Sequence, residues 1–328
     1  MAAVPLVSIA LATYNGARFL EEQLASLFAQ SYPALEIIAT DDGSSDGTVE
    51  ILRRYEQEGR IRFVANDRRL GFCRNFERAL SLCSGEYIAL ADQDDVWDRG
   101  KIEILVRELG DSSLIYSDAE LIDAAGKPLA PSLVAASGIR PLAGHCFREL
   151  VCNSSVTGCT ALFRRELLDL ALPFPEEEPF HDWWLSLVAS CRGGLRFLDT
   201  PLVRYRQHAA NAAGASEDAG FWERAVSHLV SSGTVEKKRD YYELLRRRSG
   251  WFLAWPGRFG LDDDEKRFLR DINAYAAAML APSLRPQAFL LALRHRRLLY
   301  PFASPAKRML YVMSKLVDKI LLPPRSGR

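Results

Sequence analysis

The 328-residue sequence lacks several features that would assign it to a common class of protein. Its six cysteines include no CxxC pair or other spacing typical of metal ligands, so we expect reduced thiols in a cytosolic protein rather than disulfides. No apolar run reaches eighteen residues and no hydrophobic leader precedes Val4. We therefore expect neither a transmembrane helix nor a secretory signal.

The charge of the chain is balanced overall but unevenly distributed. Lys and Arg number 42, as do Asp and Glu, and we expect no nucleic-acid partner. Residues 285–328 hold ten Lys or Arg against one acid, Asp318, which leaves 32 basic and 41 acidic residues in the rest of the chain. Such a split suggests a basic tail with a partner of its own, most simply an anionic surface.

Apolar segments that alternate with helical patterns predict a doubly wound, mainly parallel sheet in the first third of the chain. We expect four strands, separated by helices, at residues 7–12, 36–40, 61–64 and 87–90. Polar or acidic loops begin at Thr13, Asp41 and Ala91, where three of these strands end. Ligands bind at the carboxyl edge of such sheets, so we expect the site there. No GxGxxG motif follows the first strand, which argues against dinucleotide binding.

One loop is unusually acidic, because it holds Asp92, Asp94 and Asp95 within four residues. Three carboxylates so close together repel one another and are hard to desolvate unless a cation lies among them. An EF-hand is excluded, since Val96 and Trp97 stand where that loop needs an oxygen ligand and a glycine. A divalent metal that holds a diphosphate is one interpretation, and a solvated acidic turn is the other.

The pattern is less regular after Lys101. Strand character returns at residues 114–117, 157–163, 195–198 and 203–205. Residues 130–146 give no clear pattern and are interpreted as loop, and helices are expected at 164–171 and 181–189. From about Gly214 the chain is helical, and Asp262 with Glu265 fits a capping box. The last helix, 309–322, has one apolar side interrupted by charges, so it can lie on a membrane but not cross one.

Together these segments resemble the family 2 glycosyltransferases of the GT-A fold, and among them the bacterial rhamnosyltransferase-like members. Six motifs carry the resemblance over roughly residues 4–214, in the order that the family has them. They are Val7-Ser8-Ile9 through Thr13-Tyr14-Asn15, Asp41 through Thr48, Leu70-Gly71-Phe72 with Arg74-Asn75-Phe76, Asp92 through Trp97, His181-Asp182-Trp183-Trp184, and Tyr205-Arg206-Gln207-His208 with Asn211. The similarity to the rhamnose subgroup depends mostly on the last three.

The resemblance implies an α/β protein of the GT-A type, with a C-terminal helical extension. We expect a catalytic domain at residues 1–214, with a nucleotide-sugar half at about 1–118 and an acceptor half at about 119–214. The helical extension would span residues 215–328.

By resemblance, a first group of residues binds the nucleotide sugar. These residues are Thr13, Tyr14, Asn15, Asp42, Arg74, Asn75, Asp92 and Asp94. A carboxylate at Asp42 can accept from the imide N–H of a pyrimidine, while Asp92 would lie nearer the ribose. The alternatives are structural: Asp42 and Ser44 would only shape a turn, and Arg74 with Asn75 would only begin a helix.

A second group of residues, Asp94, Asp95 and His208, would bind Mg²⁺ or Mn²⁺, which prefer oxygen ligands. The sequence leaves open which aspartate of the loop is the ligand, and His208 could also contact the diphosphate.

The acceptor site by resemblance centres on Asp182, which would be the general base that takes the proton of the acceptor hydroxyl. The alternative role of Asp182 is that of a helix N-cap. Trp183 and Trp184 could form an apolar wall for the acceptor sugar, or they could be core aromatics.

The function that follows is an inverting, metal-dependent glycosyltransferase. We expect it to move L-rhamnose from dTDP-L-rhamnose to a lipid-linked or growing surface-polysaccharide glycan. The alternatives are a UDP-hexose or UDP-N-acetylhexosamine donor, or a catalytically inactive glycan-binding scaffold. We expect a cytoplasmic location with peripheral contact between the basic tail and the anionic inner face of the cell membrane. An ordinary helical subdomain packed on the catalytic core is the alternative for the tail.

Overall fold

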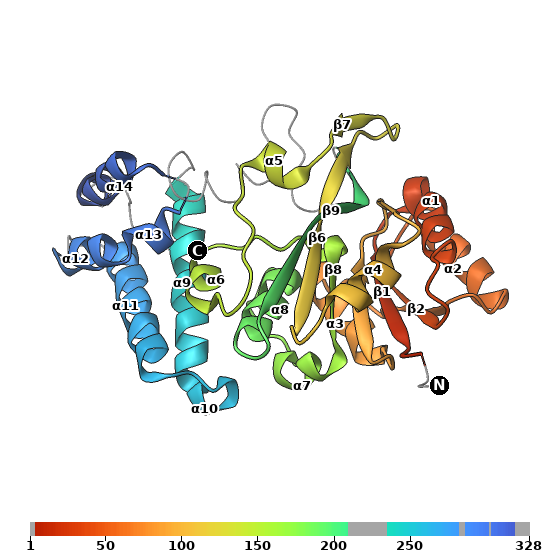
Figure 1. Ribbon diagram of the computed structural model, residues 1–328, viewed down its shortest axis with the longest axis horizontal. Coiled ribbons are helices and arrows are strands. Elements are labelled where there is room, and N and C mark those ends of the chain that lie inside the picture. Colours follow the sequence, from red (N-terminus) through yellow and green to blue (C-terminus); the bar gives the residue numbers. More distant parts are fainter. Residues whose placement is uncertain (1–3, 209–234, 282–285, 302, 319–328) are drawn as a thin grey trace. The chain divides into compact units, whose positions relative to one another are not determined.

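The computed structural model describes residues 4–208, 235–281, 286–301 and 303–318 (Figure 1). The chain divides into two compact units. Unit 1 comprises residues 1–136, 141–146 and 156–216, and unit 2 comprises residues 137–140, 147–155 and 217–328.

Unit 1 contains a nine-stranded sheet in the order β3-β2-β1-β4-β8-β6-β9-β5, with β7 paired to β6. The strands are β1 (Val7–Thr13), β2 (Leu35–Asp41), β3 (Arg62–Ala65), β4 (Tyr87–Ala91), β5 (Val96–Trp97), β6 (Leu114–Ile122), β7 (Pro128–Ala130), β8 (Ala161–Arg164) and β9 (Leu195–Arg206). The first four strands are mutually parallel, as their alternation with helices predicts. Antiparallel β8 joins them to the parallel pair β6–β9.

Most helices of unit 1 contact strands of the sheet through buried apolar side chains. The helices include α1 (Ala17–Phe28), α2 (Thr48–Gln57), α3 (Phe72–Leu82), α4 (Lys101–Glu108), α7 (Leu168–Ala171) and α8 (His181–Ser190). Single 3₁₀ turns occur at η1 (Gly158–Thr160) and η2 (Arg165–Leu167). On β1 and β4, Ile9, Leu11 and Ile88 are fully buried, since a parallel sheet packed on both faces leaves no side for water. The strands are therefore held rigidly, and so are the loops that follow them.

Four expectations about unit 1 were wrong in detail. The strand expected at 157–163 is β8, preceded by the 3₁₀ turn η1, and the helix expected at 164–171 is the 3₁₀ turn η2 followed by α7. Residues 195–198 and 203–205 belong to one strand, β9, although Pro201 lies between them. Register shifts on both sides of Asp118 in the partner strand β6 accommodate this interruption. Residues 130–146 are not loop throughout, because α5 (Leu133–Ser137) lies within them.

Unit 2 is helical in the residues described, as the pattern after Gly214 predicts. Its helices are α6 (Phe147–Cys152), α9 (Val235–Ala254), α10 (Pro256–Phe259), α11 (Asp263–Leu280), α12 (Pro286–Arg294), α13 (Arg296–Leu299) and α14 (Pro305–Asp318). The predicted capping box at Asp262 and Glu265 is present at the start of α11. Aromatic rings of Phe147, Phe252 and Phe259 pack at 4.8–5.0 Å between centroids in its core. Among the described helices, none combines the length and apolar character needed to cross a membrane.

Candidate functional site

The polar loops after β1, β2 and β4 lie at one edge of the sheet. Pairing places Thr13 opposite Asp41 and Leu11 opposite Ala91, so the three strands end within a few residues of one another. The sequence-predicted convergence of these loops is therefore present. It brings together residues that are up to eighty positions apart in the chain.

The loop after β1 is joined to the acidic loop by a reciprocal pair of hydrogen bonds. The Tyr14 N–H donates to Gln93 Oε1 at 2.8 Å, and Gln93 Nε2 donates to the Tyr14 carbonyl at 3.0 Å. Asn15 adopts a positive φ of 49° and accepts at Oδ1 from the Ser45 N–H at 2.8 Å. Thr13 is buried and donates to Asp41 Oδ1 at 2.9 Å. Tyr14 keeps 36% of its surface exposed, with the Arg69 guanidinium 4.1 Å from its ring centre.

Asp42 is buried and organises the loop between β3 and α3. Its carboxylate accepts from the Leu70 N–H at 2.6 Å, the Gly71 N–H at 2.8 Å and Asn66 Nδ2 at 3.1 Å. These contacts are those of a residue that shapes a turn. Its contact with a nucleobase remains a prediction.

Arg74 and Asn75 both make internal contacts. The Asn75 amide donates to the carbonyls of Thr13 and Thr40 at 3.2 Å each, which ties α3 to the ends of β1 and β2. Arg74 pairs with Glu77 and donates to the carbonyls of Phe174 and Pro175 at 3.1 and 2.8 Å. Their place near the nucleotide stays a prediction.

The acidic loop contains a buried carboxylate with an unsatisfied oxygen. Asp95 is fully buried, and its Oδ1 accepts from the Arg206 N–H at 3.0 Å. Its Oδ2 has no partner in hydrogen-bonding geometry among the described residues, although the Cys159 thiol lies close to the carboxylate and acts against the rise in its pKa. Burial, and then the charge of Asp94, raises the pKa of Asp95. Burial also raises the pKa of Asp92, followed in effect by the charges of Asp95, Asp94 and Asp182.

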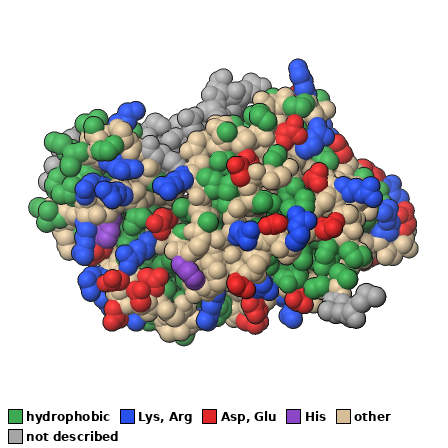
Figure 2. All heavy atoms as spheres, viewed as in Figure 1, with side chains coloured by type: hydrophobic (Ala, Val, Ile, Leu, Met, Phe, Trp, Pro, Cys, Tyr) green, Lys and Arg blue, Asp and Glu red, His purple; other side chains and the backbone are tan. Residues whose placement is uncertain are grey.

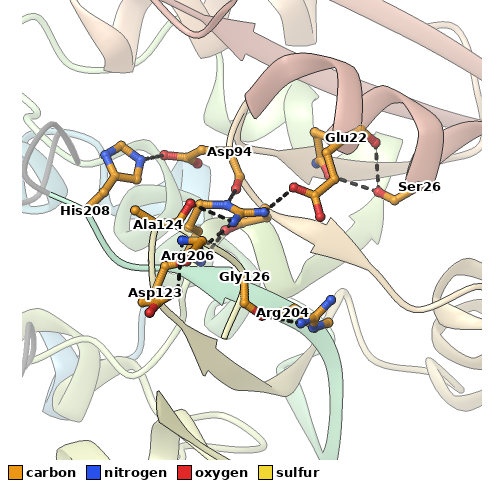
Figure 3. Close-up of polar contacts among 12 residues, drawn as sticks. Glu22, Ser26, Asp94, Asp123, Ala124, Gly126, Arg204, Arg206 and His208 are labelled. Carbon is orange, nitrogen blue, oxygen red and sulfur yellow. Dashed lines mark hydrogen bonds and ion pairs between the residues drawn. The ribbon is translucent and has the colours of Figure 1, made fainter. Parts of the chain in front are cut away.

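Two cations hold this loop, and sequence reasoning assigned neither of them. Arg206 is 2% exposed and donates from Nε to the Asp94 carbonyl at 2.7 Å and from Nη2 to Glu22 at 2.6 Å (Figure 3). Lys101 is fully buried, donates to the Cys159 carbonyl at 2.5 Å and lies 3.2 Å from the Trp97 ring centre. Burial lowers the pKa of Lys101 to about 7. Arg206 lies in the quoted Tyr-Arg-Gln-His motif, which could have identified it.

The described residues include one group with the spacing of a cation site, namely Asp92, Asp95 and Cys159, whose ligand atoms lie within 4.8 Å of one another. The carboxylates suit Mg²⁺ or Mn²⁺, and the unpartnered Asp95 Oδ2 provides a ligand atom. Cys159 does not suit these hard cations, and burial raises the pKa of its thiol well above the usual range. His208 instead contacts Asp94, with 2.8 Å between Nε2 and Oδ2 (Figure 3). No sequence motif indicated Cys159.

Asp182 lies in the first turn of α8, where Phe180 rather than Asp182 is the N-cap residue. Its Oδ2 accepts from the Gly158 N–H at 3.1 Å and its Oδ1 from the Trp183 N–H at 2.7 Å. These two donors hold the carboxylate in one orientation. Its charge contributes, after burial and the charges of Asp95 and Asp94, to the raised pKa of Asp92.

The residues beside Asp182 are mostly core residues. Trp184 is fully buried and donates from Nε1 to the Ala171 carbonyl at 3.0 Å, so it forms part of the core and not an acceptor wall. Trp183 is 7% exposed and is the tryptophan that stays a candidate for acceptor contact. The buried His181 ring stacks on Phe76 with 3.8 Å between centroids, and burial lowers its pKa. Asn211, quoted with the last motif, lies outside the described residues.

Comparison with known sequences identifies relatives of this chain. Residues 8–170 match the family described as glycosyl transferase family 2. The chain is 28% identical over 189 residues to the Escherichia coli UDP-Glc:alpha-D-GlcNAc-diphosphoundecaprenol beta-1,3-glucosyltransferase WfgD, covering 56% of this chain and 70% of the relative. It is 27% identical over 224 residues to the Shigella flexneri dTDP-rhamnosyl transferase RfbG, covering 63% and 74%. It is also 35% identical over 114 residues to Bacillus subtilis TuaG, covering 34% of this chain and 45% of that relative's length.

Solved structures share the fold across nearly the whole chain. S. aureus TarS 1-349 in complex with UDP-GlcNAc superposes with a TM-score of 0.58 at 18% identity, covering 96% of this chain and 89% of the TarS 1-349 chain. The mannosyltransferase PcManGT from Pyrobaculum calidifontis, in complex with GDP-Man and Mn²⁺, has a TM-score of 0.51 at 22% identity, covering 97% and 88%. Identities this low show the fold alone. The chain therefore carries a glycosyl transferase family 2 domain with a fold of the GT-A type.

Proposed function

We propose that the protein is an inverting, metal-dependent glycosyltransferase that moves a sugar from a nucleotide donor to a glycan or lipid-linked acceptor. The observation that carries this proposal is the cluster of carboxylates at the carboxyl edge of the sheet, with a buried Asp95 Oδ2 that lacks a partner among the described residues. A buried carboxylate oxygen that accepts no hydrogen bond destabilises a fold unless a ligand completes it. Binding of a neutral glycan alone would not require a cluster of buried carboxylates.

The donor that we propose is dTDP-L-rhamnose. The quoted Asp-Gln-Asp-Asp-Val-Trp, His-Asp-Trp-Trp and Tyr-Arg-Gln-His motifs support it, as does the similarity to a relative named as a dTDP-rhamnosyl transferase. A UDP-sugar donor is the second candidate, favoured by the similarity to a relative named for UDP-Glc and to TarS with UDP-GlcNAc.

The nucleotide would lie over the loops after β1 and β2. Tyr14 has an exposed face on which a base can stack, and the Gln93 contacts hold its backbone. Thr13, Asn15 and Asp42 complete this pocket in the proposal, while Asn75 and Arg74 fix α3 beside it. Asp92 would contact the ribose and Asp94 the diphosphate.

Asp94, Asp95 and His208 are the residues that would hold Mg²⁺ or Mn²⁺, with Asp92 as a further oxygen ligand. When bound, such a cation offsets the negative charge that develops on the departing nucleoside diphosphate. The chain's own contribution is to hold the carboxylates in place. Arg206 fixes the Asp94 backbone and Asp95 Oδ1, and Lys101 fixes the neighbouring Cys159 carbonyl.

Asp182 would act as the general base. The acceptor oxygen forms a bond to the anomeric carbon as the bond between that carbon and the diphosphate oxygen breaks, and the acceptor proton passes to Asp182. Attack on the face opposite the leaving group inverts the anomeric centre. The N–H groups of Gly158 and Trp183 hold the carboxylate so that it can receive this proton.

A panel of nucleotide sugars tests the proposal. We expect dTDP-L-rhamnose with Mn²⁺ or Mg²⁺ to raise the melting temperature most, because a ligand that binds only the folded state stabilises it. When the enzyme is incubated with dTDP-L-rhamnose and either cation, we also expect slow, metal-dependent hydrolysis of the donor. If UDP-sugars raise the melting temperature as much as dTDP-L-rhamnose does, the assignment of dTDP-L-rhamnose as donor is wrong. If a nucleotide sugar stabilises the protein but is neither hydrolysed nor transferred, the glycan-binding scaffold is favoured.

We also propose that unit 2 contacts an anionic membrane surface peripherally. Leu290 on α12 and Leu310 and Met313 on α14 are more than half exposed, and these two helices pack together. Figure 2 shows hydrophobic and basic side chains side by side where these helices lie. Each basic residue near such a surface contributes about 1 kcal/mol, which salt screens. Residues 319–328, the end of the basic tail, lie outside the described part of the chain.

Vesicle sedimentation tests this contact. We expect enrichment on anionic over neutral vesicles at low salt, and weaker binding for Lys307→Glu on α14. Arg270→Glu on α11 is the matched control, because it makes the same charge change at another exposed position of unit 2. Equal binding to the two kinds of vesicle would leave the helices of unit 2 as an ordinary subdomain.

A further inference from the structure

Unit 1 has an arginine-rich groove of about 660 Å³ away from the acidic loop. Arg68, Arg69, Arg74 and Arg78 line it together with one acid, Glu77. Leu172 and Pro173 contribute to an apolar wall. No residue of the acidic loop lines the groove, so it is separate from the predicted metal site.

Most of the positive charge in this groove is uncompensated. Arg74 pairs with Glu77, which cancels one charge of each sign. Arg68, Arg69 and Arg78 make no ion pair with any residue that the structure describes, and all three are exposed. Arg74 and Arg78 lie one turn apart on α3 and so share a face of that helix. The groove therefore presents about three unpaired guanidinium groups.

The groove adjoins the predicted nucleotide pocket. Arg69 stacks on Tyr14 at 4.1 Å, and the backbone N–H groups of Leu70 and Gly71, in the same loop, donate to Asp42. A molecule in the groove could thus lie beside a bound donor without displacing it. This is the position expected of part of an acceptor.

We propose that this groove binds phosphate groups of the acceptor, an inference that rests on the proposed glycosyltransferase function. Guanidinium groups bind phosphate oxygens in pairs of parallel hydrogen bonds, and several together select multiply charged anions over neutral sugars. The phosphate could be the diphosphate that joins a lipid to its glycan, or the phosphodiester of a polymer. Both present the same chemistry to the arginines.

Calorimetric titration with phosphate probes tests the inference. The chelator EDTA is present, so that the acidic loop holds no added cation and repels phosphate. The probes are inorganic pyrophosphate, geranyl diphosphate and a short glycerol-phosphate oligomer. We expect Arg78→Ala to weaken binding of the preferred probe by about tenfold, as for loss of a charged phosphate contact. Arg53→Ala, an equal charge loss at an exposed position on α2, should stay within about twofold.

The pattern among the probes assigns the source of the phosphate. Tighter binding of geranyl diphosphate than pyrophosphate indicates a lipid diphosphate, and tighter binding of the oligomer indicates a polymer backbone. Equal losses for Arg78→Ala and Arg53→Ala, or no binding of any probe by the wild type, would overturn the inference. Arg78→Lys, which keeps the charge, should fall between wild type and Arg78→Ala and guards against misfolding of the alanine variant. Arg78 is not among the residues proposed to bind the donor, so donor stabilisation of the Arg78 variants reports on the proposed function separately.

Discussion

Carboxylates at the two ends of the parallel strands differ in their hydrogen-bond partners and in the direction of their pKa shifts. At the amino end, Glu36 Oε1 accepts from the Ser84 N–H at 2.7 Å, from Ser84 Oγ at 2.9 Å, from the Gly85 N–H at 3.2 Å and from Ser8 Oγ. Burial alone would raise the pKa of Glu36, but these hydrogen bonds outweigh it and lower the pKa. At the carboxyl end, Asp95 has an oxygen without a described partner, and its pKa is raised.

The difference separates a structural carboxylate from a candidate functional one. The fold itself supplies the donors that Glu36 needs, and only glycine fits at Gly85, where a Cβ would lie 2.7 Å from the Leu6 carbonyl oxygen. The fold leaves one carboxylate oxygen of the acidic loop, Asp95 Oδ2, without a described partner, which is the expected state of a group that a ligand completes. Removing a charge should therefore cost stability at one end and ligand binding or chemistry at the other.

The largest expected effect is on chemistry, at Asp182. Asp182→Asn keeps an acceptor for the Gly158 N–H but cannot take a proton. We expect a folded protein with near-normal donor and metal binding, and transfer lowered by about 10²-fold or more. Initial rates of transfer, measured beside thermal melting and donor titration, check this. Asp199→Asn, an exposed aspartate of β9, is the control, and transfer within a few-fold of wild type for Asp182→Asn would return Asp182 to a structural role.

The next effect is on metal-dependent nucleotide binding, at Asp95. Asp95→Asn can still accept the Arg206 N–H, but it removes the buried charge. We expect dTDP binding with Mn²⁺ to weaken by about 10–100-fold, without loss of stability in the absence of metal, because repulsion from Asp94 is relieved. Calorimetry with Mn²⁺ and with EDTA measures both states. Asp111→Asn, at an exposed position, should change neither, and wild-type activity that survives chelation would contradict the metal assignment.

Local sequence pattern predicted the parts of the fold and site that depend on neighbouring residues. The apolar runs gave β1, β2 and β4, and parallel pairing then required the loops at Thr13, Asp41 and Ala91 to meet. The acidic loop was identified from its three aspartates alone. The division of roles among Asp92, Asp94 and Asp95 stays a prediction, because it depends on the ligand.

Contacts between residues far apart in the sequence could not be predicted from local pattern. Lys101 and Cys159 meet across 58 positions, and nothing in either local pattern indicates the other. The contacts of Asp42 and Arg74 with the loops at Leu70 and Phe174 likewise depend on how helices pack on the sheet. Strand β9 was predicted as two strands, because its continuity through Pro201 depends on register shifts in the distant partner strand β6.

The smallest expected effect is on stability alone, at Glu36. Glu36→Gln keeps one acceptor oxygen but loses the charge that strengthens the bonds from Ser8, Ser84 and Gly85. We expect a loss of about 1 kcal/mol in the free energy of unfolding at pH 7, with transfer activity unchanged. Because the folded pKa lies below the unfolded value, this stabilisation is present above the unfolded pKa of 4.5 and is lost as the pH falls through the folded pKa.

Urea unfolding at pH 7 and at successively lower pH should therefore show that the difference in free energy of unfolding between wild type and Glu36→Gln shrinks. Glu58→Gln, an exposed glutamate after α2, should show neither the loss nor the pH dependence. A difference for Glu36→Gln that grew on acidification would mean that the amino-end carboxylate is not held by its donors, and the contrast between the two ends of the strands would fail.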